Sequence, residues 1–353
     1  MTLKEANDYG TGFDFGYLAD GAPNAPFEIS NEANTFIFAF GGLTLIIVMS
    51  AISALLWHWR VIPVLVNALS LIFKKPLDVG GPVGLSATAN IFLGQVEAPL
   101  LVRPYLATMS KNELLILMTV GMSTIAGSVM VIYTTMLSSI YGLGLIGHFL
   151  TASLISVPAG IMYANMMIPS DTKTDFPADD SSKMYSSTMD ALTRGTQSGI
   201  DIFLNVAAML IVVMALVFLV NATLGVLPDI QGQPLTMERI VGWIFAPLAW
   251  CMGIPWQESQ AAGELLGVKT ILNEFVAYIY LADTTNYVLS EKSSLIMLYA
   301  LCGFANFSSV GILLSGMSAM VPERRKDLIA VSVKALWAAL LASCMTGFIV
   351  GIL

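Results

Sequence analysis

The sequence predicts an all-α polytopic membrane protein, built as an inverted repeat with two re-entrant helical hairpins and two broken transmembrane helices. Three observations predict this class. Of the 353 residues, 56% are hydrophobic and 11% are charged, with a mean hydropathy of +0.77, a combination that soluble globular domains rarely show. Most apolar residues lie in long runs without Asp, Glu, Lys or Arg. Two further apolar segments are interrupted by glycine and by a carboxylate at an apparent tip.

Charge and cysteine content exclude several classes of protein. A net charge of −8 with only 16 Lys and Arg argues against a nucleic-acid partner, because binding phosphates requires clustered basic side chains. Cys251, Cys302 and Cys344 lie in apolar surroundings without a CxxC pair. Neither a disulfide framework nor a structural zinc site is therefore expected.

Six runs are long and apolar enough to cross a membrane, which requires about 20 predominantly apolar residues. In chain order the sequence predicts an extracytoplasmic amphipathic segment (1–33), a scaffold transmembrane helix (34–58), an interfacial helix (60–75), re-entrant hairpin 1 (76–107), a broken transmembrane helix (112–140), a transmembrane helix (144–168), a polar cytoplasmic linker (169–200), a second scaffold transmembrane helix (201–227), an interfacial helix (236–253), re-entrant hairpin 2 (254–284), a second broken transmembrane helix (291–320) and a C-terminal transmembrane helix (327–353).

The basic residues predict the orientation, because Lys and Arg in short loops are retained on the cytoplasmic side. The basic residues beside the predicted spans are consistent with a cytoplasmic location; they are Arg60, Lys74, Lys75, Arg103, Lys111, Arg324, Arg325 and Lys326. The acidic N-terminal segment and Leu353 are then outside. Residues 1–26 lack a basic region followed by an apolar one, so no signal peptide is expected.

The two interrupted segments are interpreted as hairpins that enter and leave the membrane on the same side. Such backbone is tolerated only where it is buried in protein or lines a cavity. Their polar tips fall at Gly94-Gln95-Val96-Glu97 and at Asn273-Glu274.

The surroundings of the two hairpins are alike, which predicts an inverted repeat of the kind that secondary transporters use. In each half an Arg opens an apolar stretch, and a hairpin, a polar turn and a span with a Ser- and Gly-containing core follow. Arg60 precedes Glu97 by 37 residues, and Arg239 precedes Glu274 by 35. A chance match of short apolar sequences is the alternative.

Glu97 and Glu274 are the first candidates for a functional site. A carboxylate at membrane depth costs roughly 2.5–3.5 kcal/mol, so its presence indicates a role. The alternative is that they are interfacial, or paired with Arg103 or Lys269. Gln95 and Asn306 offer donors and acceptors to an uncharged polar solute, although Asn also serves in helix packing. The cores 123–128 and 303–309 can unwind and expose carbonyls, or their small residues can permit close packing.

Three motifs together resemble the concentrative nucleoside transporters: Gly94-Gln95-Val96-Glu97-Ala98-Pro99, Asn273-Glu274-Phe275-Val276-Ala277-Tyr278 and Cys302-Gly303-Phe304-Ala305-Asn306-Phe307-Ser308-Ser309. The resemblance covers the chain from about residue 30 to its end. It implies a homotrimer in the bacterial inner membrane that imports nucleosides such as uridine, cytidine or adenosine. The driving force would be a co-transported cation, Na⁺ or alternatively H⁺, with an elevator motion of the hairpins and broken helices past a scaffold. No resident cofactor is expected.

The resemblance also implies roles for individual residues. Gln95 and Glu97 would hydrogen-bond the nucleobase, with Val96 and Val129 against it. Glu274, Asn306 and Ser309 would bind the ribose hydroxyls, and Phe304 would line the pocket. A sodium site would comprise the Asn90 side chain, the Thr124 hydroxyl and the carbonyls of Leu93 and Ile125, which are hard oxygen ligands.

The chain departs from the family pattern in two ways. Val96 stands where the family has Thr or Ser, which leaves the preference between purines and pyrimidines open. The family also carries two membrane helices upstream of the first span here.

Three other functions are alternatives to transport: an intramembrane enzyme acting on a lipid or nucleoside-like substrate, a channel, and a shortened scaffold that binds nucleoside without transporting it. His58 and His148 are the only histidines, and neither an HExxH motif nor a nucleophile elbow occurs, so an enzyme is not expected.

Overall fold

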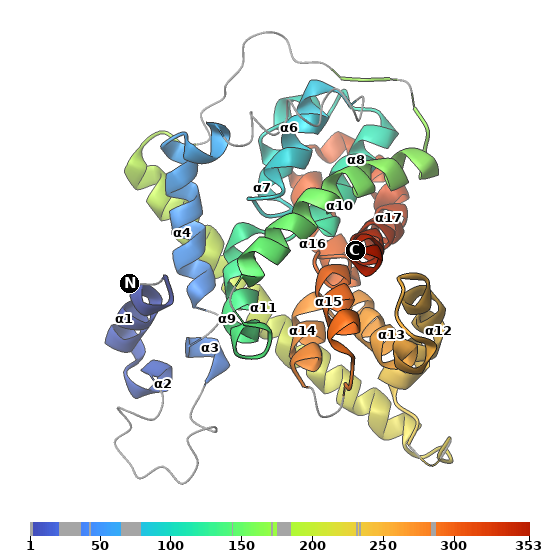
Figure 1. Ribbon diagram of the computed structural model, residues 1–353. Coiled ribbons are helices and arrows are strands. Elements are labelled where there is room, and N and C mark those ends of the chain that lie inside the picture. Colours follow the sequence, from blue (N-terminus) through green and yellow to red (C-terminus); the bar gives the residue numbers. More distant parts are fainter. Residues whose placement is uncertain are drawn as a thin grey trace. The chain divides into compact units, whose positions relative to one another are not determined.

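The computed structural model describes residues 3–20, 37–41, 44–64, 79–142, 144–170, 172–174, 185–230, 232, 234–283 and 287–353, which form helices joined by turns and loops (Figure 1). The all-α class is confirmed. Backbone contacts divide the chain into two compact units. The first comprises Met1–Pro63, Gly127–Met136 and Lys183–Ala215, and the second comprises Val64–Ala126, Leu137–Ser182 and Leu216–Leu353.

The first unit is held together by close packing of two helices. Its elements are α1 (Leu3–Phe15), α2 (Tyr17–Asp20), α3 (Phe38–Gly41), α4 (Leu45–His58) and the beginnings of α9 (Gly127–Tyr141) and α11 (Thr188–Leu224). A Cβ atom on Gly195 would lie 2.6 Å from the Cβ of Ala54, and one on Gly199 would lie 2.6 Å from the Cα of Ile47. Because these glycines are four residues apart, they share the face of α11 that packs on α4.

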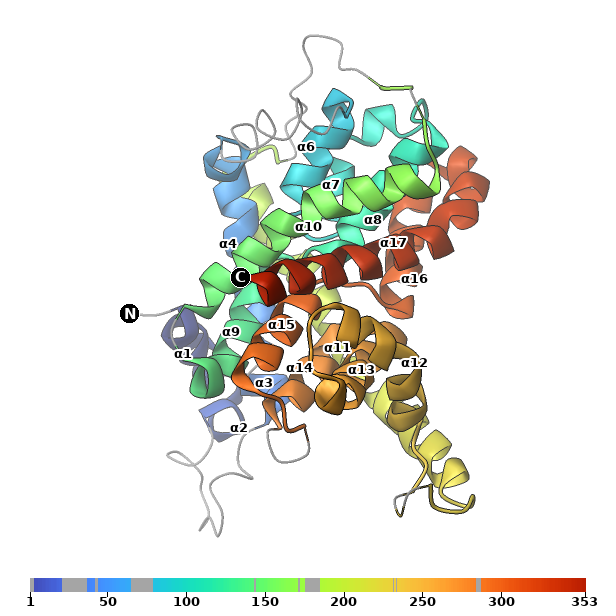
Figure 2. The same cartoon turned by 45° about the vertical axis from the view of Figure 1, so that its right-hand side comes forward.

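The second unit contains the hairpin segments and is organised around its last helix. Its elements are α6 (Gly81–Ala89), α7 (Glu97–Leu100), η3 (Arg103–Tyr105), α8 (Lys111–Ser123), the end of α9, α10 (Leu145–Met167), the end of α11, α12 (Met237–Cys251), α13 (Trp256–Ile271), α14 (Glu274–Ala282), α15 (Glu291–Ala300), α16 (Phe307–Met320), η4 (Pro322–Arg324) and α17 (Arg325–Ile352). The long helix α17 packs against α8, α10, α15 and α16 (Figure 2).

Helices α12 and α13 form a tight pair with a bend of 118° between them. A Cβ on Gly263 would lie 2.5 Å from the carbonyl oxygen of Gly242, and one on Gly267 would overlap the side chain of Val241. Glycine is therefore required where the two helix backbones approach each other.

The lengths of the helices can be compared with the six predicted spans. Within the described residues, two helices are long and apolar enough to cross a membrane, Leu145–Met167 and Pro322–Ile352, and the bent pair α12 and α13 adds a third if it is counted as one span. The other predicted spans contain interruptions or shorter apolar stretches. Range 34–58 holds α3 and α4, range 112–140 holds α8 and α9, and range 291–320 holds α15 and α16.

The helix α11 begins inside range 169–200, for which the sequence predicts a polar linker; it starts at Thr188 and is 37 residues long. Two hydrogen bonds lie at its start: the amide of Asp190 donates to the Ser187 hydroxyl over 3.1 Å, and the Asp190 carboxylate accepts from the Ser186 amide over 2.9 Å. These bonds satisfy donors at the start of the helix.

Range 76–107, predicted as hairpin 1, contains α6, α7 and η3, and range 254–284, predicted as hairpin 2, contains α13 and α14. Parts of the predicted segments lie outside the described residues, namely 21–36, 65–78, which includes Lys74 and Lys75, and most of 171–184. The membrane depth and orientation of every segment, and the inverted relation of the two halves, stay predictions.

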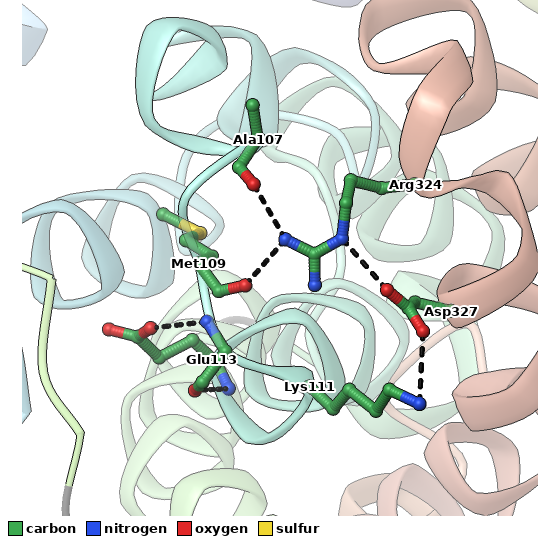
Figure 3. A network of polar contacts seen from close by, with 7 residues as sticks. Ala107, Met109, Lys111, Glu113, Arg324 and Asp327 are labelled. Atoms are coloured by element: carbon green, nitrogen blue, oxygen red, sulfur yellow. Dashed lines mark hydrogen bonds and ion pairs between the residues drawn. The ribbon is translucent and has the colours of Figure 1, made fainter.

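A network around Arg324 joins the end of hairpin 1 to the start of α17 (Figure 3). The Nη1 atom of Arg324 donates to the carbonyls of Ala107 and Met109, each over 2.7 Å, and its Nε atom donates to Asp327 over 2.8 Å. Lys111 pairs with the other oxygen of Asp327 at 3.0 Å. Together these four polar contacts hold the loop 107–111 against the start of α17.

Candidate nucleoside and cation site

The centre of the candidate site is a hydrogen bond between two side chains that sit at the starts of two helices. Glu274 is the first residue of α14, and Asn306 is the N-cap of α16. The Nδ2 atom of Asn306 donates to Oε2 of Glu274 over 2.8 Å, and both residues are buried, at 1% and 5% exposure respectively. The partial positive charge at helix N-termini favours a carboxylate in this position.

Capping fixes the orientation of both groups. The Oδ1 atom of Asn306 accepts from the Ser309 amide over 2.7 Å, which leaves its Nδ2 atom directed to Glu274. In the same way, Asn273 caps α14 by accepting from the Val276 amide over 2.9 Å. The predicted residues Glu274, Asn306 and Ser309 are thus brought together by capping bonds.

The breaks in the two interrupted helices meet. Gly303 lies between α15 and α16 with a φ of +130°, and a Cβ added there would lie 2.7 Å from the carbonyl oxygen of Ser123, the last residue of α8. Both the backbone angle and the close approach require glycine. Phe304, which follows it, is half-buried, and its carbonyl accepts from the Asn306 amide over 2.8 Å.

The tip of hairpin 1 presents Gln95 and Val96 to neighbouring helices. Gln95 is 9% exposed, and among the described residues its Oε1 atom has no hydrogen-bond partner. A Cβ on Gly121 of α8 would lie 3.4 Å from the Cβ of Gln95, so the two are in van der Waals contact. Val96 fills the space left by Gly316 of α16, where a Cβ would lie 2.7 Å from its Cγ1 atom.

Glu97 folds back over the backbone of the same tip. A Cβ on Gly94 would overlap the Oε2 atom of Glu97, so this conformation requires glycine at position 94. Glu97 is half-buried and opens α7. Arg103, one of its suggested partners, is exposed in η3.

The residues expected to bind sodium lie where α6 and α8 end. Asn90 is the C-cap of α6 and is fully buried; its Nδ2 atom donates to the Ser86 carbonyl over 3.2 Å, whereas its Oδ1 atom has no partner among the described residues. Thr124 is the C-cap of α8, and its hydroxyl donates to the Val120 carbonyl over 3.0 Å, which leaves its lone pairs free to accept a cation. Leu93 and Ile125, which lie near Asn90 and Thr124 in the sequence, are both buried.

Val129 differs from the other predicted site residues. It lies in the first turn of α9, which belongs to the first compact unit, whereas the remaining predicted residues belong to the second. Its contact with the nucleobase stays a prediction.

Lys269 belongs to the framework of the site, although the sequence suggests it only as a partner of a glutamate. Its Nζ atom donates to the carbonyl of Ala300, the last residue of α15, over 2.8 Å. The signal was present in the sequence, because Lys269 is the only basic residue between Arg239 and Lys292. Gly316, which accommodates Val96, carried no signal of its own.

Comparison with known proteins decides the family. A model of the Na⁺-dependent nucleoside transporter C-terminus matches residues 148–351, and a nucleoside recognition model matches residues 39–140. The nucleoside permease NupC of Helicobacter pylori is 35% identical, over 97% of this chain and 81% of its own length. This chain belongs to the concentrative nucleoside transporter family.

Other members of the family support this assignment over nearly the whole chain. The putative nucleoside permease NupX of Escherichia coli is 33% identical, over 98% of this chain and 82% of its own length. The solved structure of CNTnw in an inward-facing, substrate-bound state is 34% identical in sequence. The match covers 99% of the present chain and 82% of the CNTnw chain, with a TM-score of 0.88. The protein is therefore an integral membrane protein of the nucleoside transporter class.

Proposed function

We propose that this protein imports nucleosides by symport with a cation, Na⁺, through elevator-type alternating access in a bacterial inner membrane. The observation that carries the proposal is the buried hydrogen bond between Asn306 and Glu274 at two helix N-termini. A carboxylate held there accepts from two vicinal hydroxyls through charge-assisted bonds, which are stronger than neutral ones. Ribose offers such a pair.

The remaining residues complete the proposed substrate site. Ser309 lies one turn from Asn306 and contributes to the ribose subsite. The Oε1 atom of Gln95, which has no partner among the described residues, accepts from an N–H group of the base, and this removes the cost of a buried, unsatisfied acceptor. Glu97 also hydrogen-bonds the base, Val96 and Val129 lie against it, and Phe304 lines the pocket. Because Val96 is apolar, it offers the base no hydroxyl group.

Sodium is the proposed coupling ion because of the chemistry of Asn90. Its buried Oδ1 atom has no partner in the described part of the chain, and an amide oxygen is a ligand that suits a hard cation. The Thr124 hydroxyl and the carbonyls of Leu93 and Ile125 complete the set. An ion that orders residues 90–96 prepares Gln95 for the base, so cation and substrate each increase the affinity for the other.

The moving body of the proposed elevator consists of the hairpins and the broken helices, and the scaffold comprises the segments 34–58 and 201–227. Contacts within the second unit support a common motion. The breaks meet at Gly303 and Ser123, and Arg324 ties the end of hairpin 1 to α17, which packs against the broken helices α8, α15 and α16. A homotrimer is proposed from the family alone.

The test is uptake of labelled uridine and adenosine into proteoliposomes under an inward sodium gradient. Wild-type protein should show saturable, sodium-dependent uptake, and Glu274→Gln should reduce it to background because a neutral amide makes weaker bonds to the ribose hydroxyls. Undiminished uptake by Glu274→Gln would contradict the site, and uptake driven by a proton gradient without sodium would contradict sodium coupling. Binding without uptake would favour a scaffold that binds nucleoside.

A further inference from the structure

Lys269 is a buried cation outside the proposed substrate and sodium sites. It lies in the last turn of α13, its side chain is fully buried, and its Nζ atom donates to the carbonyl of Ala300 over 2.8 Å. An ammonium group is retained in a protein interior only where hydrogen bonds and opposite charge compensate for lost hydration. Its position therefore needs an explanation beyond packing.

The ammonium completes a set of donors at the C-terminal end of α15, just before the break. The carbonyl of Leu298 accepts from the Tyr278 hydroxyl over 2.9 Å, and the carbonyl of Tyr299 accepts from the Thr346 hydroxyl over 3.2 Å. Lys269 supplies the donor for Ala300, the last carbonyl of the helix. Because the end of a helix carries partial negative charge, a cation is favoured there.

The corresponding place in the first half has no basic side chain among the described residues. Lys269 precedes Glu274 by five residues, and the residue five before Glu97 is Phe92. Instead, the Thr124 hydroxyl lies at the end of α8, and the Oδ1 atom of Asn90, which has no partner in the described part of the chain, lies at the end of α6. The first half thus has free oxygen ligands where the second has a lysine.

We propose that Lys269 serves as a built-in cation of hairpin 2. Its ammonium group lies at the end of α15, in the position that corresponds to the exchangeable sodium ion at the end of α8. It is a positioning residue: it holds the break between α15 and α16, and hence Asn306, in line with Glu274. The second half then takes up no ion of its own. This inference rests on the function proposed above.

The test is chemical rescue of a truncated side chain. Lys269→Ala is purified, its folding is checked by gel filtration and thermal unfolding, and uridine and adenosine binding is measured by calorimetry in saturating sodium chloride. We expect affinity to fall about tenfold or more, as when a charged hydrogen bond is lost. Millimolar propylammonium, which replaces the missing part of the side chain, should restore most of it, and propanol should not.

Matched variants separate charge from packing. Lys269→Met keeps the apolar stem and should bind as weakly as Lys269→Ala, Lys269→Arg should retain part of the affinity, and Lys292→Ala, at an exposed lysine of α15, should bind as the wild type does. Wild-type affinity in Lys269→Met, or a folded Lys269→Ala that propylammonium does not rescue, would overturn the proposal.

Two further outcomes are also decisive. If Lys269→Ala does not fold, Lys269→Arg and Lys269→Met decide, and equal affinity in these two overturns the built-in cation. Wild-type protein that binds neither nucleoside in sodium overturns the proposed function itself, which distinguishes that failure from a failure of the inference about Lys269.

Discussion

Asn306 has two tasks that its side chain performs with different atoms. Its oxygen caps α16 and its nitrogen donates to Glu274. Asn306→Asp keeps a good N-cap but places a second carboxylate beside Glu274, whereas Asn306→Ala removes both bonds. We expect Asn306→Ala to lose about 1 kcal/mol of stability through the cap, and both variants to lose nucleoside affinity.

Thermal unfolding and calorimetric binding of uridine, measured on both variants, check this expectation. If Asn306→Asp binds as well as the wild type, Asn306 does not act through Glu274.

Val96 and Gly316 form a complementary pair at the tip of hairpin 1. A methyl group at position 316 would lie 2.7 Å from the Cγ1 atom of Val96, so Gly316→Ala should displace the tip and weaken nucleoside binding. Adding Val96→Ala should restore space and recover binding. Gly311→Ala, on the same helix with nothing within 4 Å, is the matched control and should behave as the wild type.

Competition by unlabelled purine and pyrimidine nucleosides in the uptake assay measures the effect. Independent, additive losses in the double variant would show that the two residues are not coupled.

At the scale of elements, the contact between α4 and α11 in the first unit leaves no room for a side chain at its glycines. A Cβ on Gly199 would lie 2.6 Å from the Cα atom of Ile47, which is backbone and cannot rotate away. We expect Gly199→Ala to lower stability by about 1–3 kcal/mol, as overpacking does. Gly147→Ala, in α10 with nothing within 4 Å, carries the same gain in helix propensity and should not destabilise.

The measurement is thermal unfolding of both purified variants in detergent. If Gly199→Ala and Gly147→Ala unfold at the same temperature, the added methyl group at position 199 does not destabilise the contact between α4 and α11.

Helical content was predictable from sequence because long charge-free runs have few alternatives to helices in a membrane. Helix ends were less predictable. The start of α11 depends on how Ser186, Ser187 and Asp190 bond to one another, and a polar composition alone indicated a loop. The polar residues at the hairpin tips could be found because they interrupt apolar sequence, but Lys269 and Gly316 act through partners far away in the chain, and their roles follow only from packing.

At the scale of the whole molecule, the proposed transport by a moving body requires that its parts move together. Arg324 would contribute to this, since its guanidinium binds the carbonyl of Ala107 at the end of hairpin 1, the carbonyl of Met109 in the following loop, and Asp327 of α17. Arg324→Ala should leave nucleoside binding nearly unchanged, because Arg324 is not part of the site, but should lower the unfolding temperature and slow uptake.

Equilibrium binding and initial uptake rates, compared in one preparation, separate the two effects. The neighbouring Arg325→Ala, which removes an exposed side chain, is the control. Uptake by Arg324→Ala at the wild-type rate would show that this network does not couple hairpin 1 to α17.

The meeting of Gly303 with the Ser123 carbonyl has a mechanical consequence. Where side chains separate two backbone segments, changes of rotamer can accommodate a displacement of one segment without moving the other. Here no side chain lies between the two segments, so the backbone at one break is in direct contact with the backbone at the other. In the proposed sites, a cation beside Thr124 and a sugar beside Asn306 would therefore lie on either side of one backbone contact, and a displacement at one site would be transmitted to the other.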